Sequence, residues 1–167
     1  MPLNDYSNDY TLILGWSSSH STSKYLYLLK YVLLKLREKV DFKLLVMEDA
    51  NFSIDGLEIE AIKWSEENEI EQFQRMDIGL YPLPLHKEWV LGKSGLKAIQ
   101  YCALNIPAVA TNVGFNDKVI IDKETGYLVK TDDEWMEKLL LLINDNNLRK
   151  AFVWLPEIIF LKIIPSM

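Results

Sequence analysis

The chain has 167 residues, enough for one domain with its own hydrophobic core and too few for two of ordinary size. A net charge of −6 at pH 7 argues against nonspecific binding to nucleic acid or to anionic membranes. The single cysteine, Cys102, excludes an intramolecular disulfide and cysteine-rich metal sites. The sequence has neither a signal-peptide pattern nor an apolar run of the ~20 residues that a membrane span needs. We therefore expect a cytoplasmic protein without a transmembrane segment, one that meets a membrane only peripherally through a partner.

In the first half of the chain, short apolar runs alternate with amphipathic stretches. This order is typical of a parallel sheet with helices on both faces. The pattern predicts strands at residues 11–14, 43–47 and 57–62 and helices at residues 22–38 and 66–75. We expect Gly15 to end the first strand and a serine-rich loop to follow it. The strict alternation of residues 57–62 is typical of a strand near the edge of a sheet.

The second half continues the alternation. It predicts strands at residues 77–81, 107–111 and 127–129 and helices at residues 93–104, 133–143 and 146–152. The domain organisation that follows is an N-terminal extension at residues 1–10, an α/β domain with a doubly wound parallel sheet (Rossmann-like) at residues 11–152, and an atypical apolar tail at residues 153–167. The tail has no helical or alternating period and contains two prolines, which leaves open a docked segment or a truncated end.

A ligand site is expected where the strand order of a doubly wound sheet reverses, at the carboxyl ends of the strands. There the loop of residues 15–21, with His20, should face the loop of residues 82–92, with Trp89. The helix that follows has Lys93, Lys97 and Gln100 on one face. The opposite face, which we expect to be buried, carries Leu96, Ala98, Ile99, Cys102 and Ala103.

The two lysines in the first turn of this helix oppose the helix dipole and repel each other. A diphosphate held by Lys93, Lys97 and the backbone N–H groups of Ser94, Gly95 and Leu96 would remove that cost. Two solvated surface lysines are the alternative. A P-loop is excluded because Lys87 occupies the position of its first glycine, and no dinucleotide-binding glycine pattern follows Gly15.

Residues 95–114, with the sequence GLKAIQYCALNIPAVATNVG, resemble the C-terminal signature of group 1 (family 4) retaining glycosyltransferases. Residues 13–17, 77–82 and 126–129 fall at the spacing of that family, so the resemblance extends over residues 11–152. It implies the C-terminal half of a GT-B fold, which binds a UDP- or GDP-linked nucleotide sugar without a metal cofactor. The implied reaction transfers a hexose to a polysaccharide or glycolipid acceptor.

The resemblance also implies roles for individual residues. By position, Gly15, Ser17, Lys93, Ser94, Gly95, Leu96 and Lys97 would contact the donor diphosphate or sugar, Gln100 the ribose, and Lys63 and Trp64 the base. Two family glutamates are replaced by Gly92 and Gln100, and the usual arginine near the first glycine is Trp16. No catalytic residue can be assigned.

The resemblance leaves two hypotheses on function. In one, the chain is the donor-binding part of a transferase, inactive without an N-terminal acceptor-binding half, because catalysis needs both reactants held in register. In the other, it is a non-catalytic degenerate Rossmann-like module used for protein interaction. Gly92 and Gln100 favour the second hypothesis, whereas Lys93, Gly95 and Lys97 favour the first.

Overall fold

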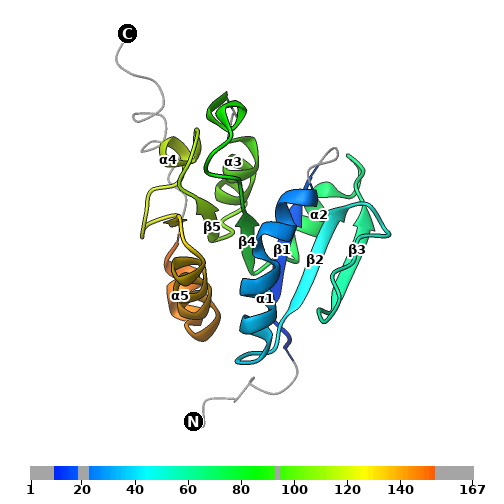
Figure 1. Cartoon of the computed structure of the whole chain (residues 1–167). Helices are drawn as coiled ribbons and strands as arrows, with labels where there is room; N and C mark the ends of the chain where they lie inside the picture. Colours follow the sequence, from blue (N-terminus) through cyan, green and yellow to red (C-terminus); the bar gives the residue numbers. More distant parts are fainter. Residues whose placement is uncertain (1–9, 19–22, 93–94, 153–167) are drawn as a thin grey trace.

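The computed structural model describes residues 10–18, 23–92 and 95–152. Within these residues, six parallel strands form one sheet in the order β3-β2-β1-β4-β5-β6 (Figure 1). The strands are β1 (Ile13–Ser17), β2 (Lys43–Glu48), β3 (Ile59–Lys63), β4 (Ile78–Tyr81), β5 (Ala108–Thr111) and β6 (Gly126–Val129). This order confirms the predicted doubly wound, Rossmann-like sheet and the edge position of the strand near residues 57–62.

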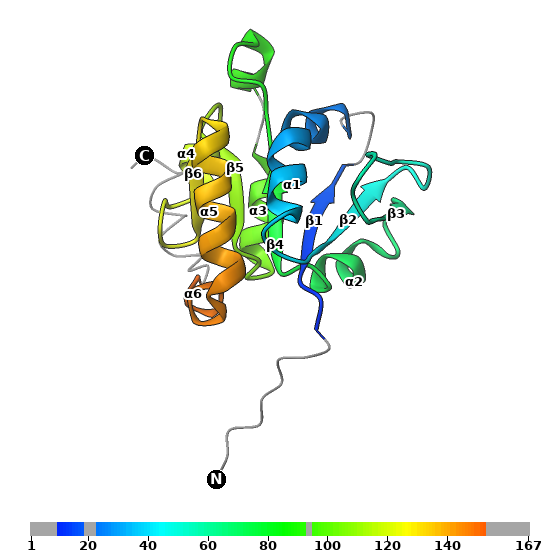
Figure 2. The same ribbon diagram turned by 60° about the horizontal axis from the view of Figure 1, so that its bottom comes forward.

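Helices cover both faces of the sheet (Figures 1 and 2). One face carries the 3-10 helix η1 (Ser23–Leu29), α1 (Lys30–Arg37) and α5 (Asp132–Asn144), and the other carries α2 (Glu69–Gln74) and α3 (Leu96–Ala103). The remaining elements are η2 (Glu88–Gly92), α4 (Asn116–Val119) and α6 (Asn146–Ala151). No helix in the described part of the chain is long and apolar enough to cross a bilayer. The apolar tail lies outside the described residues.

The strand order reverses between β1 and β4, and the two strands separate there. β1 pairs with β2 along its whole length, from Ile13 to Ser17. Its pairing with β4 covers only Leu14 with Ile78 and Gly15 with Gly79. Beyond Gly15 and Gly79 no further pairing joins the two strands, and their carboxyl ends border the crevice position at which ligands of doubly wound sheets bind.

The prediction that Gly15 ends the first strand is wrong. Gly15 lies inside β1, which continues through Trp16 to Ser17. A Cβ atom at Gly15 would collide with the side chain of Met76, so this glycine allows close packing rather than a turn. The strand continues because Trp16, which is 1% exposed, is paired in register with Val46 of β2.

Candidate functional site

The N-terminus of α3 is set at the carboxyl edge of the sheet by Gly95. This residue has a φ of 69°, in the left-handed region that other residues adopt only with strain. A Cβ atom at Gly95 would also lie 3.3 Å from Cγ2 of Val119 in α4. The first N–H groups of a helix have no intrahelical partners and carry partial positive charge. The helix begins at Leu96, three residues after the predicted start at residue 93, so Lys97 but not Lys93 lies in its first turn.

Lys97, in the first turn of α3, brings a positive charge to the crevice. Its Nζ atom lies 4.4 Å from the ring centroid of Trp16 in β1 and 5.6 Å from that of Tyr81 in β4. The two rings are 6.4 Å apart between centroids and inclined at 45°. The structure thus brings together one cation and two aromatic residues from the strands that flank the reversal.

Tyr101 fills the gap in which β1 and β4 diverge. Its hydroxyl lies 2.9 Å from the carbonyl oxygen of Leu80 and 3.2 Å from that of Gly15, so it donates to one strand while remaining close to the other. Burial raises the pKa of the Tyr101 phenol, and it raises the pKa of Tyr81 to about 12. Both phenols are therefore neutral around pH 7, and Lys97 brings a positive charge to this edge of the sheet.

Two buried polar atoms near the carboxyl ends of β1 and β2 have no hydrogen-bond partner. They are Nε1 of Trp16 and Oε2 of Glu48. Most buried polar groups in proteins are paired, so unpaired ones require a specific reason.

Gln100 lies on α3, one turn after Lys97. Its Nε2 atom donates a 3.0 Å hydrogen bond to Oε1 of Glu69 in α2. With the amide nitrogen engaged, the carbonyl oxygen of Gln100 is the atom able to accept a hydrogen bond from a ligand hydroxyl. The same bond ties α3 to the segment that follows β3.

The other predicted site residues are partly dispersed. Lys63 and Trp64 lie at the end of β3, where Lys63 is exposed and Trp64 is half-buried. The backbone N–H of Trp64 donates to the carbonyl oxygen of Glu48 at 3.2 Å. Lys63 and Trp64 share the carboxyl edge with Trp16 but are separated from β1 by the whole of β2. Ser17 ends β1 and is buried. Lys93, Ser94 and His20 lie outside the described residues.

The predicted buried face of α3 is partly wrong. Leu96 is 59% exposed and Ala103 is also exposed, whereas Ala98, Tyr101 and Cys102 are buried. The buried stripe follows the i, i+3, i+4 spacing of residues 98, 101 and 102, a signal that identifies Tyr101 as an inward residue. Burial raises the pKa of the Cys102 thiol to about 11, which fits the expected role of a core residue.

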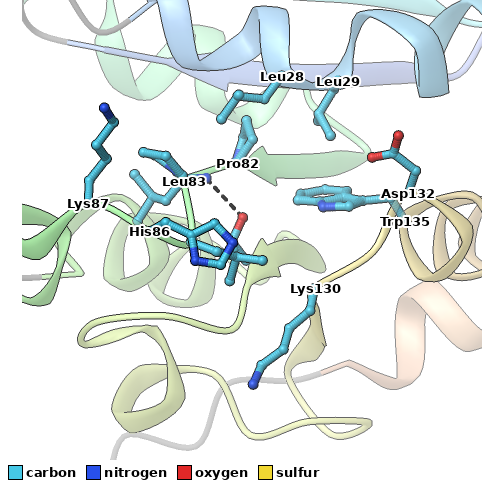
Figure 3. A pocket seen from close by; sticks show the side chains of 12 residues that line it. Leu28, Leu29, Pro82, Leu83, His86, Lys87, Lys130, Asp132 and Trp135 are labelled. Carbon is cyan, nitrogen blue, oxygen red and sulfur yellow. Dashed lines mark hydrogen bonds between the residues drawn. The ribbon is translucent and has the colours of Figure 1, made fainter.

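A cavity of about 350 Å³ lies beside the crevice, between η1, the segment after β4 and the start of α5 (Figure 3). Apolar side chains such as Leu29, Pro82 and Trp135 form its walls, and the N–H of Leu83 donates to Oγ1 of Thr111 at 2.8 Å. Lys87 and Lys130 extend toward opposite ends of the opening rather than toward its centre. The cavity therefore has no convergent charged centre comparable with the one around Lys97.

The described residues contain no group of three or more His, Cys, Asp or Glu side chains that could hold a metal ion.

Comparison with known proteins identifies the family. A family model described as "Glycosyl transferases group 1" matches residues 56–153, more than half of the chain. The chain belongs to the group 1 glycosyltransferases. No curated protein matches this group 1 domain.

Solved structures of glycosyltransferases share the fold of this group 1 domain. The C-terminal domain of LpcC, a group 1 family protein from Francisella tularensis, has a TM-score of 0.60 at 22% identity, over 90% of this chain and 84% of that one. S. aureus TarM, in a complex that includes UDP, has a TM-score of 0.64 at 17% identity, over 92% of this chain and 35% of that one. Anabaena HepE with UDP-glucose has a TM-score of 0.63 at 13% identity, over 91% of this chain and 44% of that one. The chain thus spans about a third of TarM, and these matches confirm the fold of a GT-B C-terminal half.

Proposed function

We propose that this group 1 domain binds the diphosphate of a nucleotide sugar between the carboxyl ends of β1 and β4. The observation that carries the proposal is the position of Lys97, whose Nζ lies 4.4 Å from the Trp16 ring and 5.6 Å from the Tyr81 ring at the point of strand reversal. Next to it, the N-terminus of α3 presents backbone N–H groups and the positive end of the helix dipole. In a chain with a net charge of −6, this local concentration of positive charge favours an anionic ligand.

The rest of the ligand follows the carboxyl edge toward β3. The carbonyl oxygen of Gln100 would accept a hydrogen bond from a ribose hydroxyl, because its amide nitrogen donates to Glu69. Glu69 begins α2, the first helix after Lys63 and Trp64 at the end of β3. The base would then lie beside these two residues, as the resemblance implies. Gly15, Ser17, Lys93, Ser94 and Leu96 remain proposed donor contacts.

Metal-independent binding is part of the proposal. A divalent cation neutralises a diphosphate in many nucleotide sites, and here Lys97 and the N-terminus of α3 would do so instead.

The proposed role in the complete reaction is donor binding for hexose transfer to a polysaccharide or glycolipid acceptor. Two of the similar structures were solved with UDP or UDP-glucose, which supports a nucleotide-sugar ligand for this fold. Because the chain spans only part of TarM and HepE, the acceptor would be held by a second, N-terminal half. We expect the isolated chain to bind the donor without transferring the sugar.

Calorimetric titration of the purified chain with UDP, GDP, UDP-glucose and GDP-mannose, with and without magnesium, tests this proposal. We expect saturable, magnesium-independent binding that Lys97→Ala weakens by about tenfold, or about 1.4 kcal/mol. The matched control is Lys138→Ala, because Lys138 also lies over an aromatic ring, Tyr127, at 5.0 Å, but on α5 away from the crevice. Absence of binding at millimolar ligand, with a folded protein, would refute the proposal and favour a protein-interaction module.

A further inference from the structure

We infer that Trp16 is a positioning residue for Lys97, holding its ammonium group at the crevice through the face of the indole ring. The inference rests on the proposed function and adds to it Trp16, which stands where the family usually has an arginine. The contact is a cation–π interaction, in which a cation within about 6 Å of a ring centroid is attracted by the ring, most strongly by that of tryptophan. The 4.4 Å distance from Nζ of Lys97 to the Trp16 ring meets this criterion.

The Trp16 ring is itself fixed. It is 1% exposed and belongs to a strand paired with β2 along its whole length. Lys97, by contrast, carries a long side chain that loses rotamer freedom when its end is held in one place. A rigid ring therefore reduces the entropy that a ligand would lose by ordering Lys97.

The indole nitrogen of Trp16 is buried without a hydrogen-bond partner. Burying Nε1 without a hydrogen-bond partner costs free energy that a phenylalanine or leucine would avoid. The nitrogen therefore does not explain the presence of this side chain, whereas its large π face does. An aromatic face also attracts a cation without neutralising its charge.

Tyr81 supports the same arrangement from the other strand. Its ring centroid lies 5.6 Å from Nζ of Lys97, and the side chain is 6% exposed. With Trp16 on β1 and Tyr81 on β4, the ammonium group lies over rings from both sides of the strand reversal. A change in either ring should therefore affect the proposed diphosphate position through Lys97.

A double-mutant cycle on UDP affinity tests the inference. We expect Trp16→Leu to weaken binding by about tenfold and Lys97→Ala by at least as much. The double variant should bind no more weakly than Lys97→Ala alone, because Trp16 acts through Lys97. Trp16→Phe, which keeps an aromatic face, should give an intermediate loss and provides the cycle if the leucine variant fails to fold.

A second readout needs no ligand. In the free protein, the Lys97 methylene protons nearest Nζ should resonate upfield because of the Trp16 ring current, and Trp16→Leu should abolish that shift. Lys138, over Tyr127 at 5.0 Å, is the internal reference whose shift should not change. A general loosening of the fold would move both lysines.

Three results would overturn the positioning role. UDP binding unchanged in Trp16→Leu overturns this role alone and leaves the proposed function standing. Losses that add in the double variant mean that Trp16 acts independently of Lys97. Absence of UDP binding by the wild-type protein refutes the proposed function and, with it, the role of Trp16.

Discussion

Removal of the Tyr101 hydroxyl should destabilise the domain by about 1–2 kcal/mol. A single O–H can donate only one hydrogen bond, and the shorter contact, 2.9 Å to the Leu80 carbonyl, is the better candidate. The Tyr101→Phe variant therefore loses one buried hydrogen bond and leaves a buried carbonyl with one acceptor site unused. Such losses cost about 1–3 kcal/mol, less where the carbonyl keeps another partner. The ring itself, fully buried, still fills its space.

Urea denaturation followed by circular dichroism measures this difference, and thermal denaturation should show a Tm lower by about 2–8 °C. Tyr31→Phe is the control, because Tyr31 is 71% exposed and its hydroxyl should contribute nothing measurable. A Tyr101→Phe variant as stable as the wild type would refute the idea that this hydroxyl joins the diverging strands. A loss above about 4 kcal/mol would mean that the ring had moved as well.

Substitutions at three other positions follow from the site. Gln100→Glu places a second carboxylate 3.0 Å from that of Glu69. The repulsion between them raises the pKa of the pair, so the variant should lose about 1 kcal/mol of free energy of unfolding at pH 8 and recover it near pH 5. Thermal denaturation at both pH values measures the difference. In the wild type, the neutral Tyr81 phenol stabilises the fold fully below pH 10, and this contribution is lost by about 1.4 kcal/mol per pH unit as pH rises through about 12. Tyr81→Phe should lack this part of the alkaline loss of stability. Urea denaturation at several pH values tests this, and an equal dependence of the free energy of unfolding on pH in both proteins would contradict it. Gly95→Ala should cost about 1–2 kcal/mol for its left-handed φ of 69°, and Gly95→Asn less, with UDP affinity falling in the same order.

Much of the fold could be predicted from the sequence because the alternation of apolar runs and amphipathic stretches is a local property. All six strands lie within two or three residues of the predicted ranges. The error at Gly15 has a different origin. Glycine usually signals a turn, but here the lack of a side chain at Gly15 allows Met76 to pack against β1. The residues around position 15 do not indicate this contact, because Met76 is distant in the sequence.

The candidate site was only partly predictable for the same reason. Gly95 and Lys97 were predicted as ligand contacts from charge and from the free N–H groups and dipole of the helix, which depend on neighbouring residues alone. The contacts of Lys97 with Trp16 and of Gln100 with Glu69 join residues far apart in the sequence and depend on the sheet order. Tyr101 was missed because the buried face of the helix was assigned to its aliphatic residues and Cys102, without Tyr101.

The position of Lys97 is set by packing one turn further along α3. Lys97 and Tyr101 are four residues apart and therefore lie on the same side of the helix. The Tyr101 ring fits against Gly79, where a Cβ atom would lie 2.6 Å from the ring, and its hydroxyl reaches the carbonyls of β1 and β4. These contacts fix the rotation of α3 about its axis, and this rotation directs Lys97 toward Trp16. The absence of a side chain at Gly79 thus acts on the proposed diphosphate site through Tyr101, without contact between Gly79 and the ligand.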